Sequence, residues 1–305
     1  MSAERRITAV VVTHDSAAVI ESCLSKLAAA APTRGLDVRV VDNASRDDSA
    51  AVAERLLGAG AVIRLRENRG FAAGVNAVLS GFSGEWLAVL NPDLDVPPGA
   101  LDRLADALER WPRAGLAGPR VRRPDGGVER TAGYLPTLAR ERAHALFLDR
   151  LLGREGRVAH LPPRDGPVEW LSGCAWLLRG TAVRAVGPLD EAYFMYFEDV
   201  DYCRRLLDAG WQVLAVPEVE VVHAFGRGST GSDALPADGG GALLRYFRKW
   251  EADVPEDAIR RELQRGWRLR RAWHLARWAL GSRRSRVVAK RYARALEVTV
   301  GAPPD

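Results

Sequence analysis

Two neighbouring carboxylates follow a run of aromatic residues in the second half of the chain. Glu198 and Asp199 come directly after Tyr193 to Phe197, and apolar residues then recur at i, i+3 and i+7 from Val200. This spacing predicts a helix whose first turn carries both acids. Aromatic side chains beside a carboxylate exclude water and can raise its pKa, which suits a general base. The alternative is that the acids only cap the helix, because the unpaired N–H groups of a first turn favour negative charge.

A second pair of carboxylates, Asp93 and Asp95, is separated by one residue and follows an apolar run that ends in Asn91-Pro92. Mg²⁺ and Mn²⁺ prefer oxygen ligands and can be shared with a diphosphate. The spacing therefore indicates a metal site, with an ordinary turn as the alternative. His223 ends another apolar run and precedes Gly-rich sequence, which makes it a further candidate ligand.

Polar residues and glycines follow two more apolar runs. Asp42 could accept the imide N–H of a pyrimidine base, or it could form an Asx turn. Gly70 and Gly74 would let the backbone approach a ligand closely, and Asn76 could donate a hydrogen bond to that ligand. A Gly-rich segment of this kind can also form an ordinary turn that binds no ligand. Its glycine spacing matches neither the dinucleotide-binding fingerprint nor the P-loop.

The apolar runs have the length and β-branched character of buried strands, at residues 7–13, 38–41, 62–65 and 86–90. Helical patterns separate them, the first at 17–31. This alternation predicts an α/β fold with an open, mostly parallel sheet flanked by helices. In such sheets ligands bind beyond the carboxyl ends of the strands, where the polar residues fall. Further strands are expected at 171–178, 211–216 and 219–222.

Composition limits the cellular setting. A chain of 305 residues with 47% apolar residues can bury one large core or two modest ones. Its three cysteines, Cys23, Cys174 and Cys203, lie far apart and form no CxxC pair, which favours a reduced, cytoplasmic protein. No signal sequence is visible, and no run reaches the roughly 18 apolar residues of a membrane span. We therefore expect a protein that neither crosses a membrane nor is secreted.

Positive charge gathers at the C-terminal end. Residues 241–305 carry 16 Lys and Arg against 7 Asp and Glu, so this part has a net charge of +9 while the rest of the chain holds about −4. We place a domain boundary at 240, between a domain of residues 1–240 and a basic helical region of residues 241–305. Leu269, Trp273, Ala276 and Leu280 form an apolar helical stripe among arginines. Such a helix suits the surface of an anionic membrane, or it packs on the main domain with a solvated basic face.

Seven segments in this order resemble family 2 glycosyltransferases with the GT-A fold, and most of all their rhamnosyltransferase-type branch. The likeness covers roughly residues 6–230 and rests on VVVTHDS, VVDNAS, ENRGFAAGVN, LNPDLDV, LSGCAWLLR, GPLDEAYFMYFEDVDYCRR and VVHAFGRGS. The QxxRW signature of processive members is absent, which favours transfer of a single sugar. Asn91 stands at the first position of the acidic metal motif, so a metal would depend more on the diphosphate.

The resemblance implies roles for individual residues. The nucleotide-sugar site would comprise Thr13, Asp15, Asp42, Asn43, Gly70, Asn76, Asn91 and Asp93. The acceptor contacts would be Gly173, Trp176 and Asp201. Mg²⁺ or Mn²⁺ would be held by Asp93, Asp95 and His223, and Asp199 would be the general base with Glu198 beside it.

The expected reaction is inverting transfer of a sugar, with dTDP-L-rhamnose as the donor and a polyprenyl-diphosphate-linked sugar as the acceptor. UDP- or GDP-linked donors are the alternative. The enzyme would lie in the cytoplasm, attached peripherally to the inner face of the plasma membrane, and a homodimer is left open. A nucleotidyltransferase is a rival, but the pyrophosphate loop that it needs is absent from THDSAAVI. An inactive binding module is disfavoured because all the acids are present, and a nucleic-acid partner because the body is acidic and has no RNA-reading motif.

Overall fold

The computed structural model describes residues 6–129, 131–148, 158–159, 162–224 and 235–301. These residues form two compact units. The first takes in the described parts of 6–133, 158–194 and 198–224, and the second those of 134–148, 195–197 and 235–301. The predicted boundary at 240 treats the chain as two consecutive pieces. In the structure, the second unit also includes the two short internal segments. The Gly-rich sequence after His223 lies outside the described residues.

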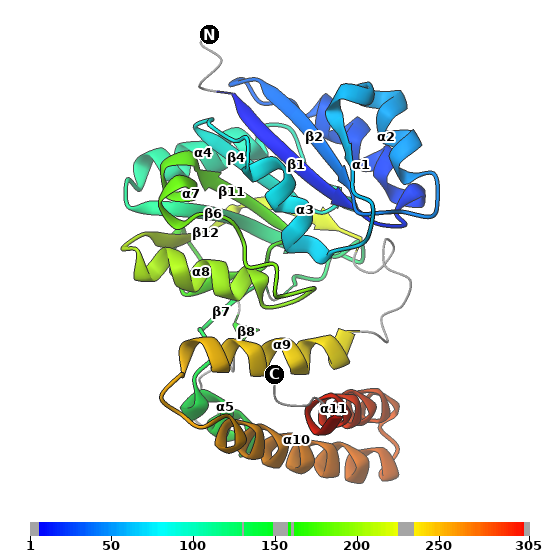
Figure 1. Ribbon diagram of the computed structural model, residues 1–305, viewed down its shortest axis with the longest axis vertical. Helices are drawn as coiled ribbons and strands as arrows, with labels where there is room; N and C mark the ends of the chain where they lie inside the picture. The colour runs from blue at the N-terminus through cyan, green and yellow to red at the C-terminus, as the bar shows by residue number, and fades with distance from the viewer. Residues whose placement is uncertain (1–5, 130, 149–157, 160–161, 225–234, 302–305) are drawn as a thin grey trace. The chain divides into compact units, whose positions relative to one another are not determined.

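Four parallel strands form one half of the main sheet (Figure 1), in the order β3-β2-β1-β4. They are β1 (Ile7–Thr13), β2 (Leu36–Asp42), β3 (Val62–Arg64) and β4 (Trp86–Leu90). β1 and β4 are buried along almost their whole length, as expected of β-branched runs covered on both faces. Thr13 is the register partner of Asp42, so the polar ends of β1 and β2 lie side by side.

Antiparallel pairing makes the other half of the sheet mixed. β11 (Ala175–Arg179) runs antiparallel to both β4 and β6, and β6 is parallel to β12. The remaining strands are β6 (Ala114–Arg122), β12 (Gln212–His223), β5 (Leu94–Asp95) and β9 (Gly166–Val168). A small second sheet has the order β10-β7-β8, from Trp170–Leu171, Ala132–Gly133 and Val158–Ala159. The predicted α/β fold class is confirmed, with the mixed half as a refinement.

Two strand expectations differ from the structure. The run 171–178 is divided into β10 and β11 because residues 172–174 leave the sheet. The runs 211–216 and 219–222 form one strand, β12, which continues past Pro217 with a register shift between Val216 and Glu220. Pro217 lacks the N–H of a regular ladder, and this irregularity accommodates it without ending the strand.

Helices flank the sheet and close the core of the first unit (Figure 1). The core gathers apolar side chains of the strands with those of the first and fourth helices. The helical elements are α1 (Ala17–Ala29), α2 (Ser49–Leu57), the short 3₁₀ turn η2 (Ala59–Ala61), α3 (Gly70–Leu79), α4 (Ala100–Arg110), α7 (Gly180–Val186) and α8 (Glu198–Asp208). As predicted, α8 begins with its acids in the first turn.

The second unit is helical. Its described helices are α5 (Leu138–Ala145), α9 (Leu235–Trp250), α10 (Glu256–Ala279) and α11 (Arg283–Gly301), so the expected helical C-terminal region is confirmed. Within this unit α10 packs against both α5 and α11. In the described part of the chain, no helix combines the length and the apolar character needed to span a membrane.

Candidate functional site

Two buried oxygen atoms lie at the adjacent ends of β1 and β2. Thr13 Oγ1 and Asp42 Oδ1 are buried, and no hydrogen-bond partner reaches either atom from the described residues. The other carboxylate oxygen of Asp42 accepts a hydrogen bond from Ser45 N at 3.3 Å. Buried polar atoms are nearly always paired, so these two oxygens fit a ligand that brings its own donors.

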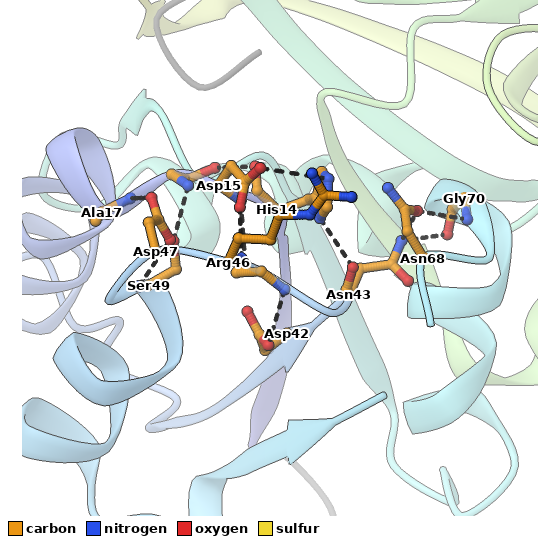
Figure 2. Close-up of polar contacts among 12 residues, drawn as sticks. His14, Asp15, Ala17, Asp42, Asn43, Arg46, Asp47, Ser49, Asn68 and Gly70 are labelled. Atoms are coloured by element: carbon orange, nitrogen blue, oxygen red, sulfur yellow. Dashed lines mark hydrogen bonds and ion pairs between the residues drawn. The ribbon is translucent and has the colours of Figure 1, made fainter. Parts of the chain in front are cut away.

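The loops after these strands are joined by Asp15 (Figure 2). Asp15 Oδ1 accepts a hydrogen bond from Arg46 N at 2.7 Å, and Asp15 N donates to Ser45 Oγ at 3.0 Å. Asp15 has φ of +48°, a left-handed conformation that a short polar side chain can support by bonding to nearby backbone. His14 Nδ1 lies 2.9 Å from Asn43 O and adds a third link. Asp15 thus fixes the two loops that border the buried oxygens.

Asn43 connects the same region to the start of α3. Its Nδ2 donates to Asn68 Oδ1 and to Gly70 O, both at 2.9 Å, and its Oδ1 accepts from Arg69 N at 3.1 Å. These contacts occupy both ends of the amide (Figure 2). The structure therefore gives Asn43 a role in positioning the loop, and its predicted contact with the donor stays a prediction.

The glycines of this loop approach protein atoms. A Cβ added at Gly70 would lie 2.0 Å from Phe194 O, and one at Gly74 would lie 2.5 Å from a methyl group of Val12. Phe71 N also donates to Phe194 O at 3.2 Å. Gly70 thus lets α3 begin directly against the chain that leads to α8, whereas the sequence suggested an approach to a ligand.

Asn76 holds the segment before α8 from the other side. Its amide pairs with both backbone groups of Leu189, donating to O and accepting from N at 2.9 Å each, and it also donates to Glu191 Oε1. Arg69 forms an ion pair with the same glutamate at 2.6 Å. Like Asn43, Asn76 is engaged by the protein, and its predicted contact with the donor stays a prediction.

Asp93 and His223 form the candidate metal pair. Asp93 Oδ1 lies 3.0 Å from His223 Nε2, both side chains are buried, and Asn91 Nδ2 lies 3.3 Å from the same nitrogen. On the other side of the imidazole, Glu129 Oε2 lies 3.6 Å from Nδ1. Burial alone would lower the pKa of His223, but the hydrogen bond and charge of Asp93, with the charge of Glu129, raise it above its ordinary value.

This donor set fits a divalent cation that a diphosphate helps to hold. A carboxylate oxygen and an imidazole nitrogen face one another, and a carboxylate behind a metal-binding histidine is the usual supporting arrangement. Among the described residues, no group of three or more His, Cys, Asp or Glu side chains is arranged to bind a metal. The third predicted ligand, Asp95, pairs instead with Lys26 at 2.6 Å on the surface.

The candidate base lies close to the metal pair. Asp199 Oδ2 accepts a hydrogen bond from Gly173 N at 3.1 Å, and the next residue, Cys174, accepts one from Asn91 N at 2.9 Å. Burial raises the pKa of the Cys174 thiol to about 12, and the charges of Glu129, Asp199 and Asp93 act in the same direction. The chain at 173–174 thus joins α8 to the end of β4, which brings the base and the metal motif together.

Glu198 has a different environment from Asp199. Burial, and then the negative charge of Asp199, raise the pKa of Glu198 well above its ordinary value, which favours the protonated form. Its Oε2 is buried, and the described residues supply no partner for it. Asp199 is only half-buried and has Oδ1 fixed by Val200 N at 2.8 Å. Of the two, Asp199 is the carboxylate that backbone N–H groups orient, at Gly173 and Val200.

Two of the three expected acceptor contacts lie in the core. Trp176 is fully buried, donates from Nε1 to Leu171 O at 3.2 Å, and stacks on Tyr202 with ring centroids 6.0 Å apart. Asp201 is also fully buried and pairs with Arg205 at 3.1 Å. In this structure neither side chain reaches solvent, so both support α8 and do not offer a surface to an acceptor. Gly173 contributes its N–H to Asp199.

Several residues of the site were missed by reasoning from the sequence. Glu129 lies in a stretch with no motif, and Lys26 occupies a helix whose pattern only indicates burial. Glu191 lies in the segment GPLDEAYF, and nothing in that segment indicates which residues it contacts. Pairings between charges 69 to 122 residues apart leave no local signal, so only the fold could reveal these partners.

The comparisons with known proteins agree with this geometry. The sequence profile described as glycosyl transferase family 2 matches residues 8–162. A curated relative from Mycobacterium tuberculosis, N-acetylglucosaminyl-diphospho-decaprenol L-rhamnosyltransferase, is 40% identical over 245 residues, which cover 73% of this chain and 77% of the relative.

Solved structures share the fold at low sequence identity. A mannosyltransferase from Pyrobaculum calidifontis, solved with GDP-Man and Mn²⁺, superposes with a TM-score of 0.59 at 17% identity, covering 97% of this chain and 86% of that one. Glucosyl-3-phosphoglycerate synthase from M. tuberculosis, solved with Mn²⁺ and UDP, gives 0.54 at 19% identity, covering 83% and 82%. With the family match across half of the chain and the rhamnosyltransferase relative across three quarters of it, this protein belongs to glycosyl transferase family 2 and is a glycosyltransferase with a GT-A-like fold.

Proposed function

We propose that the enzyme transfers L-rhamnose from dTDP-L-rhamnose to a lipid-linked N-acetylglucosaminyl diphosphate, with inversion at the anomeric carbon. The observation that carries this proposal is the 40% identity with a relative named for rhamnosyl transfer to N-acetylglucosaminyl-diphospho-decaprenol. A lipid-linked acceptor places the reaction at a membrane surface. We therefore expect a cytoplasmic enzyme attached peripherally to the inner face of the plasma membrane.

The donor base would bind at the ends of β1 and β2. Thymine carries an imide N–H, and Asp42 Oδ1 is a buried acceptor without a described partner. Thr13 Oγ1 lies on the neighbouring strand end and can pair with a second polar group of the nucleotide. Asp15 and Asn43 hold the loops that border these two atoms. UDP-linked donors carry the same imide, and guanine also presents N–H donors to a carboxylate, so Asp42 alone does not separate these donor classes.

Asp93 and His223 would hold the divalent cation, Mg²⁺ or Mn²⁺, together with the diphosphate of the donor. When bound, such a cation neutralises the charge that develops on a departing diphosphate. The proximity of the carboxylate and the imidazole, 3.0 Å apart and buried, supports this assignment. Asp95 would contribute only if it left Lys26.

Asp199 would act on the acceptor. Its carboxylate removes the proton of the attacking hydroxyl while the hydroxyl oxygen forms a bond to the anomeric carbon. The bond from that carbon to the diphosphate breaks on the opposite face, dTDP departs, and the proton remains on Asp199. The hydrogen bonds from Gly173 N and Val200 N fix the carboxylate in one orientation, which reduces the entropy lost when the acceptor binds.

The test combines a donor panel with variants of the two adjacent acids. dTDP-L-rhamnose, UDP-sugars and GDP-mannose are offered with a polyprenyl-diphospho-N-acetylglucosamine acceptor, and nucleotide release and product linkage are measured. We expect dTDP-L-rhamnose to be the preferred donor. Asp199→Asn should lower turnover by about 10²–10⁴ with donor affinity unchanged, whereas Glu198→Gln should retain more activity because burial favours the neutral form of Glu198, which glutamine resembles.

Asp208→Asn, at the exposed far end of α8, is the matched control and should turn over as the wild type does. Preference for another donor class would overturn the rhamnosyl assignment. Wild-type turnover by Asp199→Asn would overturn the assignment of the base.

A further inference from the structure

The second half of α10 and the first part of α11 form a strongly basic segment. Between Glu262 and Glu297 the chain carries 11 Lys and Arg and no Asp or Glu. α10 spans Glu256–Ala279 and α11 spans Arg283–Gly301, so this charge lies on two consecutive helices of one unit. Charge of a single sign over such a length attracts an anionic partner.

Large apolar side chains on the same segment are exposed. Leu269 is 50% exposed, Trp273 46%, Trp278 44% and Leu280 87%. In the first half of α10, by contrast, Ile259, Leu263 and Trp267 are buried. α10 thus changes along its length from a helix with a packed face to one whose leucines and tryptophans reach solvent.

The packed side of α10 is fixed by other residues. Arg270 is buried, donates to His144 O, and lies over the Phe147 ring at 4.0 Å from its centroid. His274 stacks on Tyr292 of α11, with centroids 6.0 Å apart. Trp273 also packs on the Phe147 ring, with centroids 5.4 Å apart, and Arg286 of α11 lies over the Trp278 ring, so each tryptophan contacts its own unit with part of its ring and exposes the rest.

Exposed arginines and apolar residues share the outward side. At about 100° per residue, Leu269, Trp273, Ala276 and Leu280 fall within about 60° of the helix circumference. The exposed Arg268 and Arg277 flank this stripe, about 100° to one side and about 80° to the other side of Leu269. We define the α10 surface as the exposed group Arg268, Leu269, Trp273, Arg277 and Leu280.

We propose that the α10 surface docks on an anionic lipid bilayer. The arginines would contact the headgroups, while the leucines and Trp273 enter the boundary between headgroups and acyl chains, where amphipathic rings are favoured. A nucleic acid would match the charge but would leave the leucines in water. The proposal deepens the proposed function and rests on it for the biological setting, because a lipid-linked acceptor has to be met at such a surface.

Vesicle flotation of the full-length protein tests the proposal. The protein is mixed with vesicles of phosphatidylcholine alone or of phosphatidylcholine with phosphatidylglycerol, at low and high salt. We expect flotation with the anionic vesicles only, decreasing as salt rises. Each arginine contributes about 1 kcal/mol to binding, so Arg268→Gln with Arg277→Gln should weaken it roughly 30-fold.

Two further variants make the test specific. Leu269→Ser with Leu280→Ser keeps the charge and should weaken binding at least roughly tenfold, because the apolar contact with the bilayer is lost. Arg103→Gln with Arg110→Gln removes the same charge from exposed positions of α4 and should leave flotation unchanged. Circular dichroism verifies that each variant is folded, and the arginine and leucine pairs report independently.

Several outcomes would overturn the proposal. These are equal flotation with both kinds of vesicle, no flotation, wild-type binding by the α10 variants, or equal loss in the α4 control. Binding of an oligonucleotide at salt that releases the vesicles would assign the surface to nucleic acid. A dimer in sedimentation that Leu269→Ser with Leu280→Ser dissolves would assign it to a second copy. Wild-type transfer to a short-chain, water-soluble acceptor is measured separately, so a failure of the proposed function is distinguished from a failure to bind vesicles.

Discussion

Replacing Gly70 with alanine tests whether the segment before α8 holds Asp199, the proposed catalytic base, in place. Gly70 has φ of +85°, and a Cβ atom added there would lie 2.0 Å from the carbonyl oxygen of Phe194. Unstrained C···O contacts are no shorter than about 3.3 Å, so this oxygen has to move by roughly 1 Å. Phe71 N donates to the same oxygen, so the movement also disturbs a hydrogen bond.

The displacement is expected to reach the base. Phe194 precedes Asp199 by five residues, and the two residues directly before α8, Tyr196 and Phe197, have φ of +68° and +71°. Non-glycine residues adopt such angles only where their surroundings enforce them. A shift of about 1 Å in a catalytic group costs roughly 100-fold in rate. The left-handed backbone adds about 1–2 kcal/mol of strain for alanine.

We therefore expect Gly70→Ala to lower kcat roughly 100-fold while the protein stays folded and the donor still binds. Steady-state nucleotide release measures kcat, calorimetric titration measures donor affinity, and a thermal melt reports stability. The matched control is Gly210→Ala. Gly210 has φ of +82°, and no described atom lies within 4 Å of its added Cβ, so alanine there meets the backbone strain without the clash.

Gly210→Ala should lower stability only by the backbone strain of about 1–2 kcal/mol and leave kcat within a few-fold of the wild type. Gly210 adopts the left-handed conformation just after α8, where Gly210 N donates to Leu207 O. Glycine is favoured at such a position only because it adopts this backbone conformation without strain. Equal losses of kcat in the two variants would refute the positioning argument, and so would wild-type turnover by Gly70→Ala.

Three further predictions follow from single contacts. Excess EDTA and Asp93→Asn should each abolish transfer, and added Mn²⁺ or Mg²⁺ should restore only the EDTA-treated wild type; full activity in EDTA would contradict the metal assignment. Asn76→Ala should lower kcat and leave donor KM nearly unchanged, because its amide pairs with Leu189; a raised donor KM alone would show that it contacts the donor. Burial alone would raise the pKa of Asp102, but its hydrogen bonds, including one from Arg34, lower it. The carboxylate therefore stabilises the fold above its unfolded pKa of about 4 and loses this effect as pH falls through the folded value. Asp102→Asn should cost roughly 1–3 kcal/mol at neutral pH, and denaturant titrations should show the difference shrinking in acid.

Several strands and helix α8 could be predicted because their signals are local. Ile7–Thr13 is a β-branched run of the right length, and Trp86–Leu90 is apolar throughout, so each fits a strand buried on both faces. The acids at 198 and 199 precede a helical apolar pattern, and α8 begins at Glu198. Polar residues at strand ends then fall at one edge of the sheet for topological reasons, which Thr13 and Asp42 illustrate as register partners.

Side-chain partners could not be predicted in the same way. An asparagine after a strand can bind a ligand or bridge two loops, and its local sequence is the same in both cases. Asn43 and Asn76 bridge loops here, because segments 25 to 115 residues away along the chain provide the groups that they bond. The surroundings of Trp176 could not be predicted for the same reason. Its aromatic character suits an acceptor platform, but its strand, β11, lies inside the sheet between β4 and β6.

The adjacent pair Glu198 and Asp199 shows how position within one helical turn separates two similar acids. Successive residues of a helix point about 100° apart, so one side chain can face the interior while the next faces the site. Glu198 faces the interior, where burial raises its pKa and favours the neutral acid. Asp199 meets the N–H groups of Gly173 and Val200, which orient its carboxylate. Because burial favours the neutral form of Glu198, it limits the repulsion that two adjacent ionised carboxylates would create at the start of α8.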